Sequence, residues 1–287
     1  MKTRIAVTFL KKLLAASRRN NSLICIGLDP EEAHLPPHLL DQPDPILSFN
    51  RAIIEATADL VCAYKPNLAF YEARGPAGLL TLQETLRLIP PDIPTIGDAK
   101  RGDTANTARQ YARALFEVYH FDAITAHPYL GRDSLQPFLD YHDKGIFIVC
   151  RTSNPGARDF QDALVQTGAA TEAPLYEYVA RQVLEWDTVG NVGLVVGATY
   201  PTELQRIRQI APSLPILIPG VGAQGGDLRS AARNGVDAAG ERAIIAISRA
   251  IIYAGKGRDF ATVAAQAVRN LRDTANQARH EHTRSTG

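Results

Sequence analysis

Short apolar runs alternate with longer amphipathic runs along this chain of 287 residues, and the alternation occurs eight times. Short apolar runs bounded by turn residues are typical of buried parallel strands, whereas amphipathic runs of about ten residues or more are typical of covering helices. Eight strand–helix pairs in a chain of this length predict a single-domain α/β fold, a parallel (β/α)8 TIM barrel. Charged residues fall at the ends of predicted strands, where barrels place their functional groups. An open, doubly wound sheet is the alternative.

The first four strand–helix pairs occupy the N-terminal half of the chain. Each strand is an apolar run, and each helix has apolar residues along one face. The strands are Leu23–Leu28, Val61–Lys65, Thr95–Lys100 and Ala123–Ala126, and their helices are Ile46–Leu60, Leu79–Leu88, Ala105–Tyr119 and Ser134–Tyr141. The third strand extends an apolar stretch that begins at Ile93 and leads into a charged segment.

The last four pairs follow the same pattern. The strands are Ile146–Cys150, Val192–Val196, Ile216–Ile218 and Ala243–Ile247, and their helices are Pro174–Trp186, Thr202–Ile210, a short helix after Asp227 and the closing helix Phe260–Ala278. The fifth strand is separated from its helix by a predicted loop, Thr152–Thr171. Loops of this length in compact domains are often lids or binding loops.

Both ends of the chain extend beyond the eight pairs. An N-terminal amphipathic helix, rather than a secretory signal, is predicted by apolar residues at helical spacing: Phe9, Leu10, Leu13 and Leu14. The polar segment Asn276–Gly287 predicts a frayed C-terminal tail. No linker or repeat divides the chain, so we expect one domain over residues 1–287, with its core at about residues 22–275.

Composition excludes several classes of protein. The formal net charge is +1, so neither nucleic acid nor a membrane surface is an expected partner. No apolar run reaches the roughly eighteen residues of a membrane span. Cys25, Cys62 and Cys150 are scattered in apolar runs, which predicts buried thiols in a reducing, cytoplasmic setting rather than disulfides or a zinc site.

The segment Asp98–Asp103 carries the strongest functional signal. Asp98 and Lys100 are two residues apart at a strand end, so their side chains are expected on one face, with Asp103 on the following loop. Lys65 ends the preceding strand, and a barrel would place it beside them. An alternating row of cations and anions keeps an ammonium charged in a pocket, where it can protonate or stabilise a carbanion. An ordinary rim ion-pair network is the alternative, although buried ion pairs seldom stabilise a fold.

Two later segments predict an anion site. Pro219–Asp227 follows the seventh strand and contains four glycines, and Arg249 follows the eighth strand. Barrels often bind phosphate between the loops after these two strands, and arginine suits bidentate phosphate contact. A plain glycine-rich turn with a rim arginine is the alternative.

The segment Arg151–Gly156 follows the fifth strand. Ser153 and Asn154 within it could hydrogen-bond a polar ring. The same Ser-Asn-Pro-Gly run is also ordinary turn chemistry, so the segment by itself leaves both interpretations open.

Together these segments resemble the orotidine 5′-phosphate decarboxylases of the longer, bacterial-type branch (type 2). The resemblance covers roughly Leu23–Tyr253. It is carried by Asp98–Asp103, Arg151–Gly156 and Pro219–Asp227, together with Cys25–Pro30, Lys65–Glu72, Pro128–Gly131 and Val196–Thr199. It implies decarboxylation of orotidine 5′-phosphate to UMP, the last step of pyrimidine synthesis, with no cofactor or metal.

The resemblance also implies catalytic roles. Lys65, Asp98, Lys100 and Asp103 correspond to the Lys-Asp-Lys-Asp array of the family. Lys100 corresponds to the lysine that protonates C6 of the pyrimidine once CO2 has left, and Asp98 to the carboxylate that faces the substrate carboxylate. Asp103 corresponds to an aspartate that reaches into the partner's site in a homodimer.

Binding roles follow from the same resemblance. Asp29 and Thr107 correspond to ribose-binding residues, Thr107 acting from the partner subunit. Ser153 corresponds to the serine that reads the pyrimidine edge. Gln224, on a closing loop, and Arg249 correspond to phosphate ligands.

Three other functions are compatible with parts of the pattern. Magnesium-dependent decarboxylases of keto-sugar phosphates share the Asp-x-Lys-x-x-Asp signature, although the Ser153 and Pro219–Asp227 segments fit the nucleotide enzyme better. A Schiff-base aldolase would use Lys65 or Lys100 as nucleophile and would need a lysine of lowered pKa. A nucleotide-binding protein without turnover is the third alternative.

Overall fold

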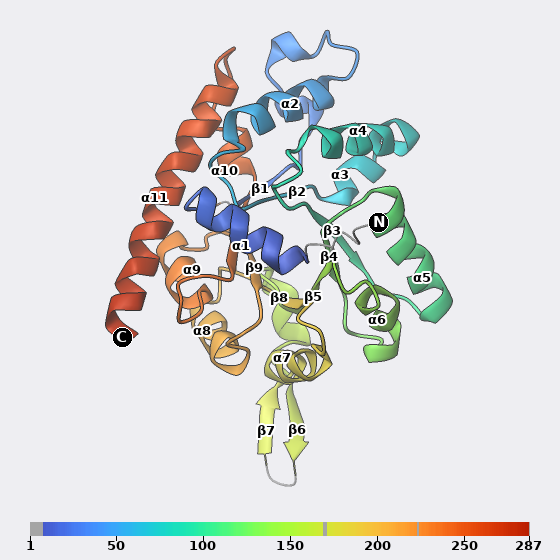
Figure 1. Cartoon of the computed structure of the whole chain (residues 1–287), viewed down its shortest axis with the longest axis vertical. Helices are drawn as coiled ribbons and strands as arrows, with labels where there is room; N and C mark the ends of the chain where they lie inside the picture. Colours follow the sequence, from blue (N-terminus) through green and yellow to red (C-terminus); the bar gives the residue numbers. More distant parts are fainter. Residues whose placement is uncertain (1–7, 169–170, 223, 287) are drawn as a thin grey trace, which may run out of the picture.

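Eight parallel strands surround an apolar interior in the computed structural model, which describes residues 8–168, 171–222 and 224–286 (Figure 1). The strands are β1 Ile24–Gly27, β2 Ala63–Lys65, β3 Ile96–Arg101, β4 Ala123–Ala126, β5 Gly145–Arg151, β8 Val192–Val196, β9 Ile216–Pro219 and β10 Ala243–Ile247. They pair in the order β2-β1-β10-β9-β8-β5-β4-β3, and bridges from Tyr64 to Thr95 and from Asn67 to Asp98 join the two ends. Because the ring is closed, the predicted (β/α)8 barrel is confirmed and the open sheet is excluded.

Helices surround the ring on its outside, except α1, which lies across one end of it (Figure 1). The helices are α1 Phe9–Arg19, α2 Pro45–Thr57, α3 Leu68–Glu72, α4 Gly75–Leu88, α5 Ala105–Arg113, α6 Arg132–Leu139, α7 Leu175–Trp186, α8 Pro201–Ile210, α9 Leu228–Gly235, α10 Arg249–Ile252 and α11 Phe260–Thr286. The short helices α3 and α10 were not predicted, and a π-helical turn, Ala114–Val118, continues α5. None of the described helices is long and apolar enough to cross a membrane.

The predicted N-terminal helix is confirmed by α1. This helix closes the end of the barrel at which the strands begin. Phe9 and Leu13 are buried among the residues inside the ring. The Phe9 ring packs edge-on against Phe147, with centroids 5.6 Å apart. Gly145, at the start of β5, makes this approach possible, because a Cβ there would lie 2.4 Å from the Phe9 ring.

The space inside the ring is filled by side chains. They are Cys25, Cys62, Ala63, Ile96, Ala123, Phe147, Val149, Val195, Leu217, Ile244 and Ala246. Cys25, Cys62 and Cys150 are free and buried, as predicted. Burial raises the pKa of the Cys25 and Cys150 thiols to about 12, so both stay neutral.

The prediction of a frayed tail over residues 276–287 was wrong for the described residues, because α11 continues to residue 286. Asn276 is buried and its Nδ2 donates to the Asn21 carbonyl at 2.8 Å. Glu281 pairs with Arg229 at 2.7 Å and with Arg233 at 3.0 Å, both on α9. Polar pairing with neighbouring elements therefore orders this segment, and such pairing leaves no apolar period in the sequence.

The predicted loop 152–171 contains secondary structure. A 3-10 turn spans Pro155–Asp159, and strands β6 Leu164–Gly168 and β7 Thr171–Pro174 form an antiparallel hairpin that projects beyond α7 (Figure 1). Residues 169 and 170, between these two strands in the sequence, lie outside the described residues. The hairpin is mostly exposed, so it lacks the apolar run by which buried strands are predicted.

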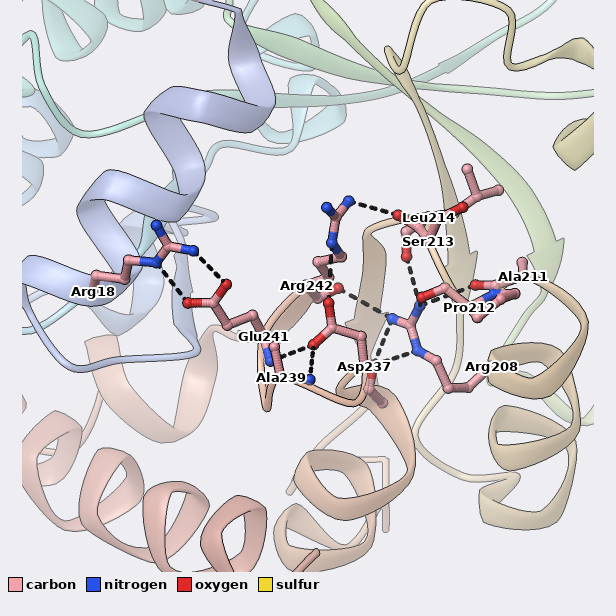
Figure 2. Close-up of polar contacts among 11 residues, drawn as sticks. Arg18, Arg208, Ala211, Pro212, Ser213, Leu214, Asp237, Ala239, Glu241 and Arg242 are labelled. Atoms are coloured by element: carbon pink, nitrogen blue, oxygen red, sulfur yellow. Dashed lines mark hydrogen bonds and ion pairs between the residues drawn. The ribbon is translucent and has the colours of Figure 1, made fainter. Parts of the chain in front are cut away.

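A buried arginine joins the loops that lead into β9 and β10 (Figure 2). Arg208 of α8 is 8% exposed, and burial lowers its pKa to about 10, which leaves it charged at neutral pH. Beside it, Asp237 pairs with Arg242 at 3.0 Å. The Arg208 guanidinium donates to five carbonyl oxygens, those of Ala211, Pro212, Leu214, Gly235 and Arg242. These bonds set where the two strands begin, at the end of the barrel away from the strand C-termini.

Replacing Arg208 with methionine should lower the free energy of unfolding by about 3–5 kcal/mol, because buried carbonyls would lose their donor. Urea denaturation followed by circular dichroism measures this change. Arg206→Met, on the same helix, is the matched control. Arg206 is 46% exposed and pairs with Glu177, so its loss should change stability by less than about 1 kcal/mol. Equal effects of the two substitutions would contradict the role given to Arg208.

Candidate active site

A cavity of about 550 Å³ opens at the C-terminal ends of the strands. It is lined by seven of the nine predicted site residues: Asp29, Lys65, Asp98, Lys100, Ser153, Gln224 and Arg249. They lie at the ends of strands or on the loops directly after them. The parallel ring brings them together, because the C-terminal ends of all its strands meet at one end of the barrel.

Three charged side chains form a row in this cavity. Lys65 Nζ lies 2.8 Å from Asp98 Oδ2, and Lys100 Nζ lies 2.5 Å from Asp98 Oδ1. The side chains of Lys65 and Asp98 are 7% and 11% exposed, whereas that of Lys100 is 43% exposed. The inner pair is therefore nearly sealed from solvent, and Lys100 is the ammonium open to a ligand.

The inner pair is charged at neutral pH. Burial alone would lower the pKa of Lys65, but the carboxylates of Asp98 and Asp29 outweigh it and raise that pKa above its ordinary value. Burial would likewise raise the pKa of Asp98, but Lys65 and Lys100 hold it well below its ordinary value. The charges are therefore in place before any ligand binds.

Asp29 faces the same inner lysine from the loop after β1. Its Oδ1 accepts a hydrogen bond from the backbone N–H of Asn67 at 3.0 Å. Burial is the main influence on Asp29 and raises its pKa, with Lys65 opposing this rise and Asp98 adding to it. Asn67 also lines the cavity and was not singled out from the sequence. Its position two residues after Lys65, at a strand end, is the signal that could have found it.

The backbone at Lys100 departs from a regular strand. Its φ is +44°, and the pairing register between β3 and β4 shifts there. The Thr125 hydroxyl accepts from the amides of Ala99, at 3.1 Å, and Lys100, at 2.9 Å, and donates to Asp98 Oδ1 at 3.0 Å. A bulge held by Thr125, rather than simple strand alternation, therefore brings Asp98 and Lys100 together. Sequence reasoning missed Thr125 because it lies within a short apolar strand.

Ser153 lies between two glycines in the loop after β5. A Cβ on Gly197 would lie 2.8 Å from Ser153 Cα, and a Cβ on Gly220 would lie 3.1 Å from Ser153 Cβ. Ser153 Oγ donates to Gln224 Oε1 at 2.6 Å. Two predicted binding residues from different loops are therefore in direct contact.

Glycine backbone and a guanidinium are presented together at the cavity. Gly220, Gly222 and Gly225 have φ of 98°, 77° and 86°, a region that glycine enters without strain. Arg249 is exposed at the start of α10. Such a combination suits an anion. Within the described ranges, no group of three or more His, Cys, Asp or Glu side chains is arranged to hold a metal ion.

A sequence model of the orotidine 5′-phosphate decarboxylase / HUMPS family matches residues 22–263. The chain belongs to this family. A relative from Thermomicrobium roseum, named orotidine 5′-phosphate decarboxylase, is 52% identical over 276 residues, which cover 96% of this chain and 97% of the relative. A relative of the same name from Dehalococcoides mccartyi is 51% identical over 271 residues, covering 94% of this chain and 98% of the relative.

Solved structures of the family share this architecture. The structure of Leishmania donovani OMP decarboxylase is 39% identical, with a TM-score of 0.82, and the match covers 96% of this chain and 100% of that chain. Leishmania donovani UMP synthase is 40% identical, with a TM-score of 0.80, over 93% of this chain but 57% of that chain. The family is therefore supported by both sequence and fold.

Two residues of the predicted family pattern lie away from the cavity. Asp103 is half-buried in the loop after β3, and its Oδ1 accepts from the Thr104 amide at 2.7 Å. Thr107 is exposed on α5. Neither is among the described residues that line the cavity. The roles assigned to them in a partner's site stay predictions.

Replacing Thr125 with valine should lower the free energy of unfolding by about 2–6 kcal/mol, because two backbone amides would lose their acceptor at about 1–3 kcal/mol each. Urea denaturation again measures the change. Thr125→Ser keeps the hydroxyl and should cost only about 1 kcal/mol for the lost methyl group. Valine and serine variants of equal stability would show that the hydroxyl does not hold the bulge.

Proposed function

We propose that this chain converts orotidine 5′-phosphate to UMP and CO2 without a metal or organic cofactor, as the final decarboxylation of pyrimidine synthesis. The observation that carries the proposal is the row Lys65–Asp98–Lys100 in one cavity with the glycine loop and Arg249. Family membership and the names of close relatives support the choice of substrate.

In the proposed reaction, the bond between C6 of the pyrimidine and its carboxyl carbon breaks, and the electron pair stays on C6. Asp98 faces the departing carboxylate, and the Lys100 ammonium donates a proton to C6 as CO2 leaves. Solvent then returns a proton to Lys100. A carbanion at C6 has no electron sink, so its stabilisation depends on charges that are already fixed, and the ammonium groups on both sides of Asp98 supply them.

The remaining cavity residues are proposed to hold the nucleotide. Asp29 binds the ribose, Ser153 reads the pyrimidine edge, and Gln224 and Arg249 bind the phosphate. The phosphate is remote from the reacting carbon, so its binding energy serves to order the loops around the base. The contact between Ser153 and Gln224 already links the two ends of the proposed nucleotide site.

We further propose that the active form is a homodimer with shared sites. Asp103 and Thr107 lie outside the cavity of their own chain, and Thr107 is exposed. A twofold partner would bring these residues to the other chain's cavity, where Asp103 completes the charge array.

The charges of the site argue against magnesium at Asp98 and against Lys65 as a Schiff-base nucleophile. A magnesium ion at Asp98 would compete with two ammonium groups and the Thr125 hydroxyl, which already occupy both carboxylate oxygens. A Schiff-base mechanism needs a neutral amine, whereas Asp98 and Asp29 raise the pKa of Lys65 and favour its charged form.

The proposal is tested by the loss of orotidine 5′-phosphate absorbance in the presence of EDTA. Rapid conversion to UMP is expected, and Lys100→Ala should reduce it at least about 100-fold, since positioned proton transfer alone contributes about 10²–10⁴-fold. The variant should still bind UMP, measured by calorimetry. Absence of turnover by the folded wild-type protein, or turnover that requires magnesium, would overturn the proposal.

The shared site predicts complementation between two inactive variants. Equal mixing of Lys100→Ala and Asp103→Ala chains should restore about a quarter of wild-type activity, because half of randomly formed dimers are mixed and each contains one intact site. The chains are mixed after reversible denaturation, and mixed dimers are verified by differential tagging. Verified mixed dimers without activity would contradict sharing of Asp103.

A further inference from the structure

Arg151, the last residue of β5, buries a positive charge next to the loop that carries Ser153. Its side chain is 0% exposed, and its guanidinium carbon lies 3.8 Å from the centre of the Tyr200 ring. Nη1 donates to Gln161 Oε1 at 3.1 Å, and Nη2 lies 3.1 Å from Asp162 Oδ1. The Tyr176 ring lies farther away, with its centre 5.9 Å from the same carbon. The charge therefore lies among two aromatic faces, of which Tyr200 is the nearer, one side-chain amide and one carboxylate.

The burial of Arg151 is not accounted for by stability. Nε and Nη2 are buried without a hydrogen-bond partner within the described part of the chain, so the Asp162 contact is an ion pair out of hydrogen-bond alignment. Asp162 is itself 41% exposed, which weakens the pair. Apolar residues of similar volume often stabilise a fold as well as or better than a buried ion pair. Burial of the Arg151 charge at a cost in stability, beside the loop that carries Ser153, indicates that this residue has a functional role.

Gln161 transmits the position of Arg151 to the loop. Its Oε1 accepts from both Arg151 Nη1 and the Thr152 amide, the latter at 2.9 Å. Its Nε2 donates to Thr152 Oγ1 at 2.9 Å, and that hydroxyl donates to Asn154 Oδ1 at 2.7 Å. Both neighbours of Ser153 are therefore connected to the buried guanidinium. Gln161 is in turn anchored, because its carbonyl accepts from the Tyr176 amide of α7 at 3.1 Å.

The loop 152–154 is also held from its other side, by residues that lie next to the Tyr200 ring. Thr199, which precedes Tyr200, donates from Oγ1 to the Ser153 carbonyl at 3.2 Å. The Gly197 amide donates to the Arg151 carbonyl at 2.7 Å. Ser153 is therefore enclosed between the Arg151–Gln161 side and the β8 loop, and the direction of its hydroxyl depends on both.

We infer that Arg151 is a positioning residue for the loop 152–154, acting through Gln161 and seated on Tyr200. None of these three is among the described residues that line the cavity, so they act on the ligand through Thr152, Ser153 and Asn154. The inference rests on the proposed function, which assigns the pyrimidine edge to Ser153. Recognition of the base then depends on a cluster that does not touch the nucleotide, whereas the phosphate, which Arg249 also binds in the proposed function, depends on it much less.

The test compares two ligands that share a ribose phosphate, UMP and ribose 5-phosphate, by titration calorimetry. In the wild-type protein UMP should bind more tightly. Gln161→Leu should weaken UMP binding at least tenfold and leave ribose 5-phosphate binding within twofold. Arg151→Met should act in the same way. A substitution at the buried Arg151 can prevent folding for that reason alone, so Tyr200→Leu provides a second route to the same loss. Tyr200→Phe is its control, because it keeps the ring and should keep the wild-type affinities.

Each outcome decides the matter. A selective loss of UMP affinity in Gln161→Leu and Tyr200→Leu supports the inference. Unchanged affinities, or equal losses for both ligands, overturn it, because a merely structural role would not separate base from phosphate. A wild-type protein that binds UMP no more tightly than ribose 5-phosphate would instead overturn the pyrimidine nucleotide assignment, and the inference with it.

Discussion

The junction between β2 and β3 is the contact on which the barrel and its proposed site both depend. β2 is short, and it joins β3 through two isolated bridges, one of which pairs Asn67 with Asp98. The same junction places Lys65 Nζ 2.8 Å from Asp98. Because this ion pair is nearly sealed from solvent, its attraction is screened little. One interaction therefore spans the seam of the ring and sets the charge of the cavity.

The end of the barrel that carries this pair contains the features that are costly for stability. A buried ion pair seldom stabilises a fold, and a non-glycine residue with positive φ, such as Lys100, costs on the order of 1–3 kcal/mol. Thr125 offsets part of this cost by satisfying the amides of the bulge. The opposite end is built for stability: α1 fills the mouth of the ring with Phe9, and Arg208 satisfies the carbonyls that precede β9 and β10.

The loops after β5, β8 and β9 form a second connected unit. Ser153 contacts Gln224 of the glycine loop and Thr199 of the β8 loop, and its neighbour Thr152 is held by Gln161. Gly197 and Gly220 leave the space in which Ser153 lies. In the proposed function this unit receives the base and phosphate, while the Lys65–Asp98–Lys100 row meets the reacting carbon. The division separates recognition from chemistry across one cavity.

All eight barrel strands were predicted to within two residues at each end, because buried parallel strands are apolar runs that need no knowledge of their neighbours. The predicted strand ends also identified Asp29, Lys65, Asp98 and Arg249 as neighbours in one site, since closure of a barrel brings all C-terminal ends together. The hairpin β6–β7 and the end of α11 were missed because polar side chains order them through distant contacts.

The sequence by itself determined the barrel, the end at which its functional groups gather and the residue types of the charge row. Only the tertiary structure decided how these groups converge: through a bulge held by Thr125 and a loop held by Arg151 and Gln161. None of these three residues carries a local signal of its role, because each acts on partners that chain folding brings together. Periodicity records which face is buried, whereas the direction of a hydrogen bond between distant elements is set only when the chain is packed.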